Sequence, residues 1–263
     1  MHMNFEEMAI LGIPIETQFG KVEPLTILDY IELEVQLQVM SFDKKRVLHE
    51  YRLNQDEKIR ETEDFTEAIK QVASEKSLKD VIVGLMSVYF TAYVAVVSAS
   101  LFKHIENEEE RLKQAYEFLL DLESEDFEHL RKILLSVNAQ SEQTAFLDPL
   151  LQARKEKSIK FHAKDQKEES PSVATYISSV VTFSGIPYKE VATWNYIQLI
   201  HAFQRIGQFK AYDTSTLFMT VAGDKVTPEP WNKNFKVNDD SNTSSLFAVE
   251  LDAFEKNIGS KIK

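Results

Sequence analysis

A run of 22 residues without a charged side chain, residues 81–102, constrains the fold of this chain more than any other feature. A helix that is apolar on all sides has to be buried, either in a protein core or in a membrane. Four serine and threonine side chains interrupt the run. Its two tyrosines, Tyr89 and Tyr93, lie in the middle, whereas membrane helices carry aromatic belts at their ends. We therefore expect a central, buried helix over this run, with a membrane-associated helix as the alternative.

The composition indicates a mainly α-helical protein. Only 7 glycines and 7 prolines occur among 263 residues, which leaves few turn signals for a sandwich or barrel of many short strands. The hydrophobic fraction of 43% supplies enough apolar side chains for a packed core, and the length allows two domains. We expect a helical bundle with a short extended or β-hairpin segment at its N-terminus, and a second, smaller helical domain.

The larger domain is expected to span residues 1–151. Alternating apolar residues from Ile13 to Val22, bounded by Pro14 and Gly20, predict an extended or hairpin-like opening. Helices should follow, because apolar residues then recur at steps of three and four. The expected starts or caps of these helices are, in chain order, Pro24, Ser41, Phe65, Ser77, Asn107 and Ser124.

Three details of this helical series can be tested. The inner face of its first helix is predicted to consist of Leu25, Leu28, Ile31, Val35 and Val39. Ser77 and Asp80 have the spacing of a capping box. The helices that start at Asn107 and Ser124 are expected to form an antiparallel pair, because the connection between them is short.

Charge and composition divide the rest of the chain. Residues 152–170 are dense in charge and poor in apolar side chains, which predicts a linker. A C-terminal helical domain is expected over residues 171–230. Residues 231–263 are expected to form an irregular segment followed by a terminal amphipathic helix.

Helix boundaries in the second domain follow from proline, glycine and capping residues. Pro171 is expected to start a helix that Gly185 ends. Thr193 is expected to cap a longer helix, and Asp213 to cap a further short helix that ends near Gly223.

Two features of the C-terminal region are candidates for binding a protein partner. The terminal helix carries an apolar stripe at steps of four, three and four residues, made of Phe247, Leu251, Phe254 and Ile258. Such a stripe can enter the groove of a partner or form a dimer, or it can fold back onto its own domain. Trp231, beside Pro230, can anchor an interface, because tryptophan is enriched at binding hot spots, or it can cover the domain's own core.

The charge and cysteine content exclude several classes of function. A net charge of −12 repels phosphate backbones, so we expect no nucleic-acid binding. The chain has no cysteine, which excludes disulfides and thiolate metal sites and fits a reducing compartment. Its first residues lack the basic start and long apolar run of a signal peptide. We expect a cytoplasmic protein.

The sequence contains no motif for catalysis or for a cofactor. Phosphate-binding glycine loops and the nucleophile elbow are missing, and none of the six histidines belongs to a paired-ligand helix motif. Glu125 and His129 share a helix face and could supply two metal ligands, although an ordinary surface pair is the simpler interpretation. We expect no enzyme and no cofactor. Acid–base chemistry by carboxylates that converge only in the fold is the alternative.

The order of elements resembles tail and baseplate assembly proteins of tailed bacteriophages. The resemblance is carried by Gly12–Ile15, by Phe19–Thr26 and by Asp29 and Tyr30. A second passage, Ile186–Val191 followed by an aromatic step, is similar to tail assembly chaperones of phages that infect Gram-positive hosts.

This resemblance implies a non-enzymatic phage protein that binds other tail or baseplate proteins, or itself, without nucleic acid or membrane. It would act in the host cytoplasm or remain in the virion. A membrane-associated protein that uses residues 81–102 and an enzyme with carboxylate chemistry are the alternatives.

Overall fold

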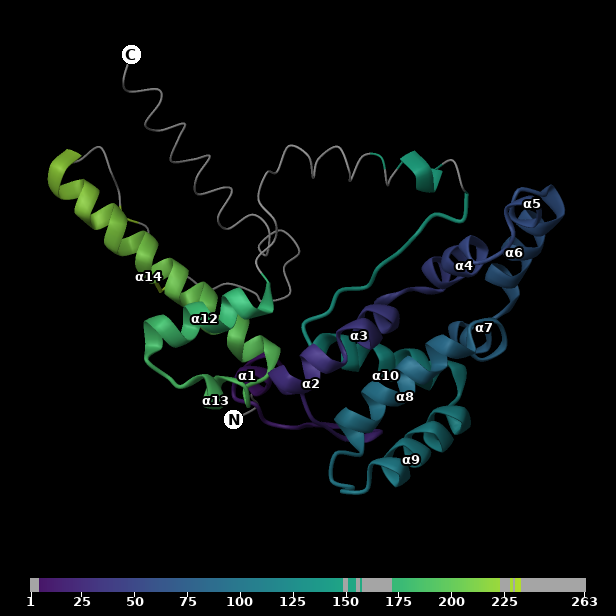
Figure 1. Cartoon of the computed structure of the whole chain (residues 1–263), viewed down its shortest axis with the longest axis horizontal. Coiled ribbons are helices and arrows are strands. Elements are labelled where there is room, and N and C mark those ends of the chain that lie inside the picture. The colour runs from purple at the N-terminus through teal and green to yellow at the C-terminus, as the bar shows by residue number, and fades with distance from the viewer. Residues whose placement is uncertain are drawn as a thin grey trace, which may run out of the picture. The chain divides into compact units, whose positions relative to one another are not determined.

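The computed structural model divides the chain into two compact units, residues 1–169 and residues 170–263. It describes residues 5–148, 151–154, 157, 172–222, 228 and 230–232. Within these ranges the chain is mainly helical with a small antiparallel sheet, as the composition predicts (Figure 1). Each unit is described by itself.

The first unit begins with a short helix and a hairpin. Its elements are α1 (Phe5–Ile10), β1 (Ile15–Thr17), β2 (Gly20–Val22), α2 (Ile27–Glu32), α3 (Glu34–Ser41), α4 (Lys44–Leu53), α5 (Glu57–Arg60), α6 (Glu63–Glu75), α7 (Leu78–Leu85), α8 (Ser87–Leu101), α9 (Glu108–Asp121) and α10 (Ser124–Val137). Ile15 pairs with Val22, and Thr17 pairs with Gly20. Gly20 has a φ of 112°, which a side chain would disfavour. The predicted hairpin is confirmed, whereas α1 was not expected.

The core of the first unit is built around α8, which packs against α3 and α9. Phe90, Tyr93 and Val97 of α8 are buried, and Tyr93 stacks on Phe127 of α10 with ring centroids 5.0 Å apart. The buried part of this helix carries no charge because neighbouring helices cover it, whereas Val88 near its start is exposed. The structure confirms that this part of the uncharged run is a buried helix.

The prediction of one continuous helix over residues 81–102 is wrong. Met86 has non-helical backbone angles, and α7 meets α8 there at a bend of 116°. The bend lets α7 pack against α4 and α10 while α8 packs against α3 and α9. In the described ranges no single helix is long and apolar enough to cross a membrane, although α7 and α8 pass that test when counted together.

The first predicted helix is also divided, and it begins later than Pro24. Thr26 caps α2 through a capping box with Asp29, and Leu33 separates α2 from α3. The buried side chains of α2 and α3 include Ile27, Tyr30, Leu37 and Met40. Of the predicted inner face, Leu25 is buried, whereas Leu28, Ile31 and Val35 are exposed. The difference arises because tertiary packing, including that of α3 against α8 and α10, decides which face is buried.

Local capping signals were predicted with mixed success. The capping box of Ser77 and the cap by Asn107 are confirmed. Ser41 instead ends α3, and Asp43 caps α4 by accepting a 2.7 Å hydrogen bond from the amide of Arg46. The predicted pairing of α9 with α10 is wrong, because α9 packs mainly against α8, and α10 against α7 and α3.

Ser124 does not cap α10. It is the first residue of that helix, and Glu123 stands in the cap position. The hydroxyl of Ser124 instead donates a 2.9 Å hydrogen bond to the hydroxyl of Ser77. The side chain therefore joins the start of α10 to the start of α7.

The second unit contains α12 (Val173–Ser184), α13 (Tyr188–Val191) and α14 (Tyr196–Ala222). Gly185 ends α12 in the left-handed conformation, with a φ of 72°, as predicted. Ser172 caps α12, while Pro171 lies outside the described residues.

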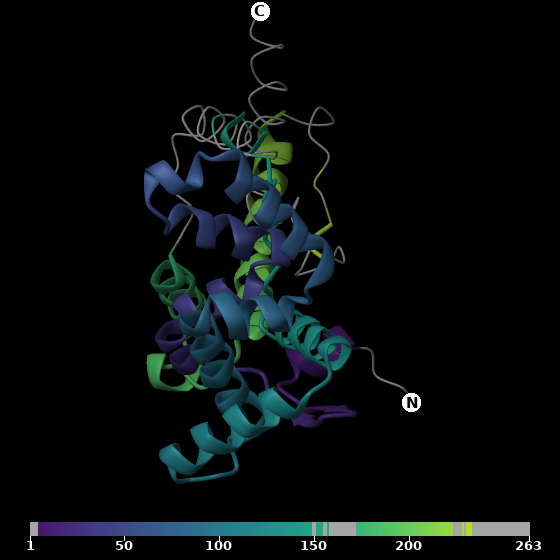
Figure 2. The ribbon, with the colours of Figure 1, turned by 90° about the vertical axis from the view of Figure 1, so that its right-hand side faces the viewer.

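Two predicted caps in the second unit are wrong. At the start of α14, Asn195 accepts a 2.8 Å hydrogen bond from the amide of Gln198, whereas the hydroxyl of Thr193 donates to the carbonyl of Glu190. Asp213 lies inside α14, which continues to Ala222 as one helix (Figure 1, Figure 2). No proline interrupts this helix, and it continues through Gly207, so Asp213 has no free helix start to cap.

Candidate interaction surface

The candidate surface is built on α14, which packs against α12 over its first half. The ring of Tyr176 on α12 contacts the ring of Phe203 on α14, with centroids 4.7 Å apart. Further along, the ammonium group of Lys210 lies 4.7 Å from the ring centroid of Phe183. In both pairs the partner lies 27 residues further along the chain. The two helices therefore run in the same direction and keep one register.

The end of α14 extends beyond α12. By the same register, the last residue of α12 lies level with Ala211, which leaves residues 212–222 beyond it. This segment, the α14 tip, is about 16 Å long at ~1.5 Å per residue. Its large apolar side chains are exposed, namely Leu217, Phe218, Met219 and Val221.

The chemistry of the α14 tip is unusual for an exposed helix. Asp213 is the one charged residue in its sequence. Leu217 is 68% exposed and Val221 is 85% exposed. An exposed helix normally carries polar side chains on its outer face, and contiguous exposed apolar groups mark interaction sites. The α14 tip is therefore suited to binding an apolar protein surface.

Trp231 lies beside the same helix. Its ring stacks on the ring of Phe209 with centroids 4.6 Å apart and an interplanar angle of 16°. The guanidinium of Arg205 donates a 2.9 Å hydrogen bond to the carbonyl of Trp231. Trp231 remains 42% exposed, so it covers α14 with one face and presents the other. After the end of α14 the chain has thus turned back along the helix.

Among the residues predicted to bind a partner, the structure places Trp231 on α14. Phe247, Leu251, Phe254 and Ile258 lie outside the described residues. The apolar side chains of the α14 tip were missed, because Asp213 was assigned to a helix start. The signal that could have found them is the stretch from Lys210 to Ala222, which contains no glycine or proline to end a helix.

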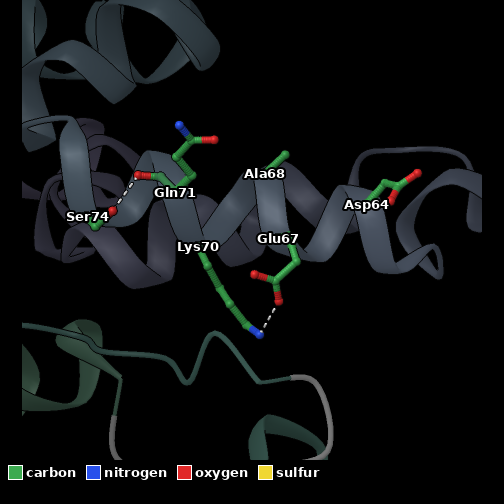
Figure 3. Close-up of a pocket in the computed structure, with 6 residues that line it drawn as sticks. All are labelled: Asp64, Glu67, Ala68, Lys70, Gln71 and Ser74. Carbon is green, nitrogen blue, oxygen red and sulfur yellow. Dashed lines mark hydrogen bonds and ion pairs between the residues drawn. The ribbon is translucent and has the colours of Figure 1, made fainter.

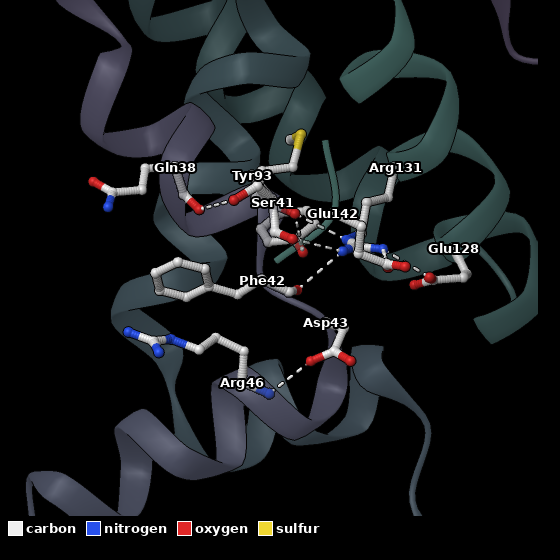
Figure 4. Close-up of polar contacts among 10 residues, drawn as sticks. Gln38, Ser41, Phe42, Asp43, Arg46, Tyr93, Glu128, Arg131 and Glu142 are labelled. Carbon is white, nitrogen blue, oxygen red and sulfur yellow. Dashed lines mark hydrogen bonds and ion pairs between the residues drawn. The ribbon is translucent and has the colours of Figure 1, made fainter. Parts of the chain in front are cut away.

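A second polar cluster lies in the first unit around Arg131, whose side chain is fully buried (Figure 4). The guanidinium donates hydrogen bonds to the carbonyls of Met40, Ser41 and Phe42, at 2.9, 3.1 and 3.1 Å. It also pairs with two carboxylates. Those of Glu128 and Glu142 lie 2.8 and 2.6 Å from its Nη1.

The Arg131 cluster joins three segments of the chain. Arg131 belongs to α10 and its carbonyl partners to the end of α3, while Gln143 pairs with the same end through its backbone. The amide of Gln143 donates to the carbonyl of Ser41 at 2.8 Å, and its carbonyl accepts from the amide of Asp43 at 2.9 Å. Because every donor of the guanidinium is directed at backbone carbonyls or at these two carboxylates, the cluster stabilises the fold.

A shallow polar hollow lies on α6 (Figure 3). Among the residues that the structure describes, its lining comes from that helix, namely Asp64, Glu67, Ala68, Lys70, Gln71 and Ser74. Lys70 and Glu67 form an ion pair of 2.7 Å within the helix, and the hydrogen bond with Glu67 raises the pKa of Lys70. These described side chains come from one exposed helix and do not converge on a substrate from several elements, so they lend no support to the carboxylate-enzyme alternative.

The predicted pair of Glu125 and His129 gains no third ligand among the described residues, where no group of three or more His, Asp or Glu side chains could hold a metal. The ring of His129 stands edge-on to the ring of Phe19, with centroids 5.8 Å apart. The side-chain amide of Gln18 donates to Asp126 at 2.9 Å and lies 3.5 Å from Nδ1 of His129. These contacts hold the hairpin against α10, which is a structural role.

Comparisons with known proteins identify the family. The model of the YomV N-terminal domain matches residues 3–145, and the model of the YomV second domain matches residues 164–236. The SPbeta prophage-derived uncharacterized protein YomV of Bacillus subtilis strain 168 is 24% identical over 233 residues, which cover 88% of this chain and 89% of that protein. No solved structure matches. Since the N-terminal model alone spans more than half of the residues, this chain belongs to the YomV family.

Proposed function

We propose that this chain is a non-enzymatic phage protein that binds other tail or baseplate proteins of the same phage through its second unit. It would do so in the host cytoplasm during assembly, or as part of the virion. The contact surface consists of the α14 tip together with the exposed face of Trp231.

Two lines of evidence support a phage protein that binds proteins. The relative from Bacillus subtilis is named as prophage-derived, and it aligns with most of this chain. The sequence also lacks catalytic motifs and is strongly acidic, which favours protein partners over nucleic acid.

The observation that carries the proposal is the exposed, nearly uncharged α14 tip. Leu217 and Val221 differ by four residues, so they lie on one face of the helix. A helix face of this kind binds by burying its apolar side chains in a groove of the partner.

Co-expression tests the proposal. The full chain is produced together with each tail and baseplate protein encoded in the same phage genome, and complexes are measured by size-exclusion chromatography with light scattering. We expect at least one stable complex, and we expect Leu217→Glu with Val221→Glu to abolish it, because the substitutions place two charges in the apolar contact.

A matched control variant is Lys189→Glu with Glu190→Lys on exposed positions of α13, which keeps the net charge. This variant should bind the partner as the unchanged chain does. A chain that binds none of these proteins, or a complex that survives the charges at the α14 tip, contradicts the proposal.

A further inference from the structure

We propose that the first unit has a binding surface of its own, at the bend between α7 and α8, and that it binds a basic, amphipathic segment of another protein. This surface, the elbow patch, consists of the exposed side chains of Val83, Leu85, Val88, Tyr116 and Leu120. It belongs to a different unit from the α14 tip, so the inference goes beyond the proposed function and does not depend on it.

The elbow patch is apolar where a surface helix is normally polar. Val88, in the first turn of α8, is 74% exposed, and Val83 and Leu85 of α7 are also exposed. No charged residue lies between Asp80 and Lys103, so no charge separates these side chains along the chain. Part of an uncharged stretch is thus exposed at the bend, whereas its continuation along α8 is buried. Exposed apolar groups that gather in this way mark interaction sites.

The end of α9 adjoins the bend and adds two apolar side chains. Tyr116 and Leu120 are exposed and lie one turn apart. The ring of Tyr116 stands edge-on to the ring of Phe90 in α8, with centroids 5.4 Å apart. The ammonium group of Lys79 in α7 donates a 2.6 Å hydrogen bond to the carbonyl of Leu120, and Val83 lies one turn after Lys79. The three helices therefore contribute to one surface, with α8 beside both α7 and α9 (Figure 1).

Carboxylates border the elbow patch. Glu117 and Asp121 follow the two apolar residues of α9 by one position each, so they form the adjoining row of that helix. Glu123 and Glu125 come directly after this row, and all four acidic residues are exposed. Residues 114–130 contain no lysine or arginine. The surface thus combines an apolar centre with a negatively charged border.

The negative border decides between the kinds of occupant. Nucleic acids and anionic lipid surfaces are themselves negatively charged, so the border repels them. A second copy of this chain is disfavoured for the same reason, because a two-fold contact between two elbow patches would bring the same carboxylates of both copies together. An occupant that satisfies both parts is a protein segment with apolar side chains for the centre and lysine or arginine for the border. An amphipathic helix provides both.

The two parts of the surface should act differently. Burial of the apolar centre supplies affinity that salt does not screen. Attraction between the border and a basic segment raises the rate of association, and salt does screen it. Loss of the apolar side chains should therefore weaken binding at any salt concentration, whereas loss of the carboxylates should weaken it mainly at low salt. This difference distinguishes docking from a general attraction to an acidic protein.

Fluorescence anisotropy with a labelled synthetic peptide tests the surface on the full chain. The probe is a helical peptide of leucine and lysine with all leucines on one face. A second peptide has glutamate in place of every lysine. We expect the chain to bind the basic peptide at least about tenfold more tightly than the acidic one. Equal binding of the two peptides overturns the proposal, because the border then has no part in recognition.

Variants of the chain locate the site. Val83→Ser with Val88→Ser should weaken binding of the basic peptide by about tenfold or more at any salt concentration. Glu117→Gln with Asp121→Asn should weaken it at low salt and have little effect at high salt. All four positions are exposed, so both variants should keep the circular dichroism spectrum of the unchanged chain. Unchanged binding at low salt in either variant overturns the proposal.

Matched control variants come from another part of the same unit. Leu28→Ser with Val35→Ser removes an exposed apolar pair from α2 and α3, and Glu32→Gln with Glu34→Gln removes two exposed carboxylates from the same helices. Neither control should change peptide binding. Losses as large as those of the elbow variants would show that the peptide responds to any apolar surface or to net charge, and they overturn the proposal.

Further measurements separate the basic segment from other occupants and from the proposed function. A dimer in light scattering, or binding to vesicles of phosphatidylcholine and phosphatidylserine, overturns the proposal if Val83→Ser with Val88→Ser abolishes it. Such a result would assign the elbow patch to a second copy or to lipid. Leu217→Glu with Val221→Glu at the α14 tip should leave peptide binding unchanged, whether or not a tail or baseplate partner is found. A loss of peptide binding in that variant would place the site on the second unit and overturns the proposal.

Discussion

The Nε atom of Arg131 on α10 donates a 2.9 Å hydrogen bond to the carbonyl of Met40 near the end of α3. The last carbonyls of a helix have no partner within the helix, and they carry the negative end of its dipole. The buried guanidinium of Arg131, from another helix, therefore supplies hydrogen-bond donors and a positive charge to the C-terminal end of α3. The same guanidinium also donates a 3.1 Å hydrogen bond, from Nη2, to the carbonyl of Phe42, the residue after α3.

Replacing Arg131 by Met should destabilise the first unit by about 3 kcal/mol, because carbonyls and two carboxylates lose their shared partner. Unfolding in urea, followed by circular dichroism, measures the loss. Lys132→Met is the matched control on the neighbouring exposed position, and it should change stability by less than about 0.5 kcal/mol. Equal stability of both variants would show that the cluster contributes little.

Tyr93 should make the first unit less stable in alkali. Burial raises the pKa of its phenol above the ordinary value of 10.0, and nearby Arg131 offsets part of this rise. Above about pH 10 the unfolded chain loses this proton while the folded chain keeps it, so stability falls by up to about 1.4 kcal/mol per pH unit.

Urea unfolding at pH 8 and at pH 10.5 tests the effect of Tyr93. Tyr93→Phe should reduce the alkaline loss, while Tyr188→Phe, at a position that is 59% exposed, should leave it as it is. Part of the loss should remain, because burial also raises the pKa of Tyr89 in the same unit. An unchanged alkaline loss in Tyr93→Phe would contradict the prediction.

Two glycines should respond to alanine in opposite directions. Neither Gly185 nor Gly84 has an atom within 4 Å of an added Cβ, so alanine causes no steric clash at either position. The backbone conformation then determines the sign of the stability change. Gly185→Ala should cost about 1 kcal/mol, because φ is 72° there. Gly84→Ala, inside α7, should stabilise by about 0.5 to 1 kcal/mol.

The two effects can be followed separately. Both tryptophans, Trp194 and Trp231, belong to the second unit, so tryptophan fluorescence reports the unfolding of the unit that contains Gly185. Circular dichroism reports the change at Gly84. The same sign of change in both variants would contradict the assigned backbone conformations.

Asp213→Ala distinguishes a helix interior from a helix start. Inside α14, alanine should stabilise the helix by about 0.5 kcal/mol, whereas at a cap it would cost about 1 kcal/mol. Thermal unfolding followed by tryptophan fluorescence gives the sign. A lower transition temperature than that of the unchanged chain would contradict the continuous helix and support the separate helix start at Asp213 that the sequence predicted.

Signals that act within a few residues were readable in the sequence. The caps at Ser77 and Asn107 and the helix end at Gly185 depend on backbone groups three or four residues away, so no distant contact is needed to form them. The hairpin at Gly20 is local for the same reason.

Errors occurred where several residues could serve the same purpose. Thr26 and Pro24 both suit a helix start, as do Asp43 and Ser41. The choice depends on which face is buried, and distant partners such as Gln143 decide that. Leu28 was predicted to face the core for this reason, and it is exposed.

For the candidate surface, the sequence by itself predicted Trp231 as a candidate anchor and indicated a mainly helical, cysteine-free and acidic chain. It did not reveal that Trp231 stacks on Phe209. It also did not reveal that α14 extends beyond the end of α12, which leaves the α14 tip exposed. Composition and helical spacing are properties of short stretches, so the chain carries them before it folds. Burial depends on which distant helices meet, and only the tertiary structure decides that.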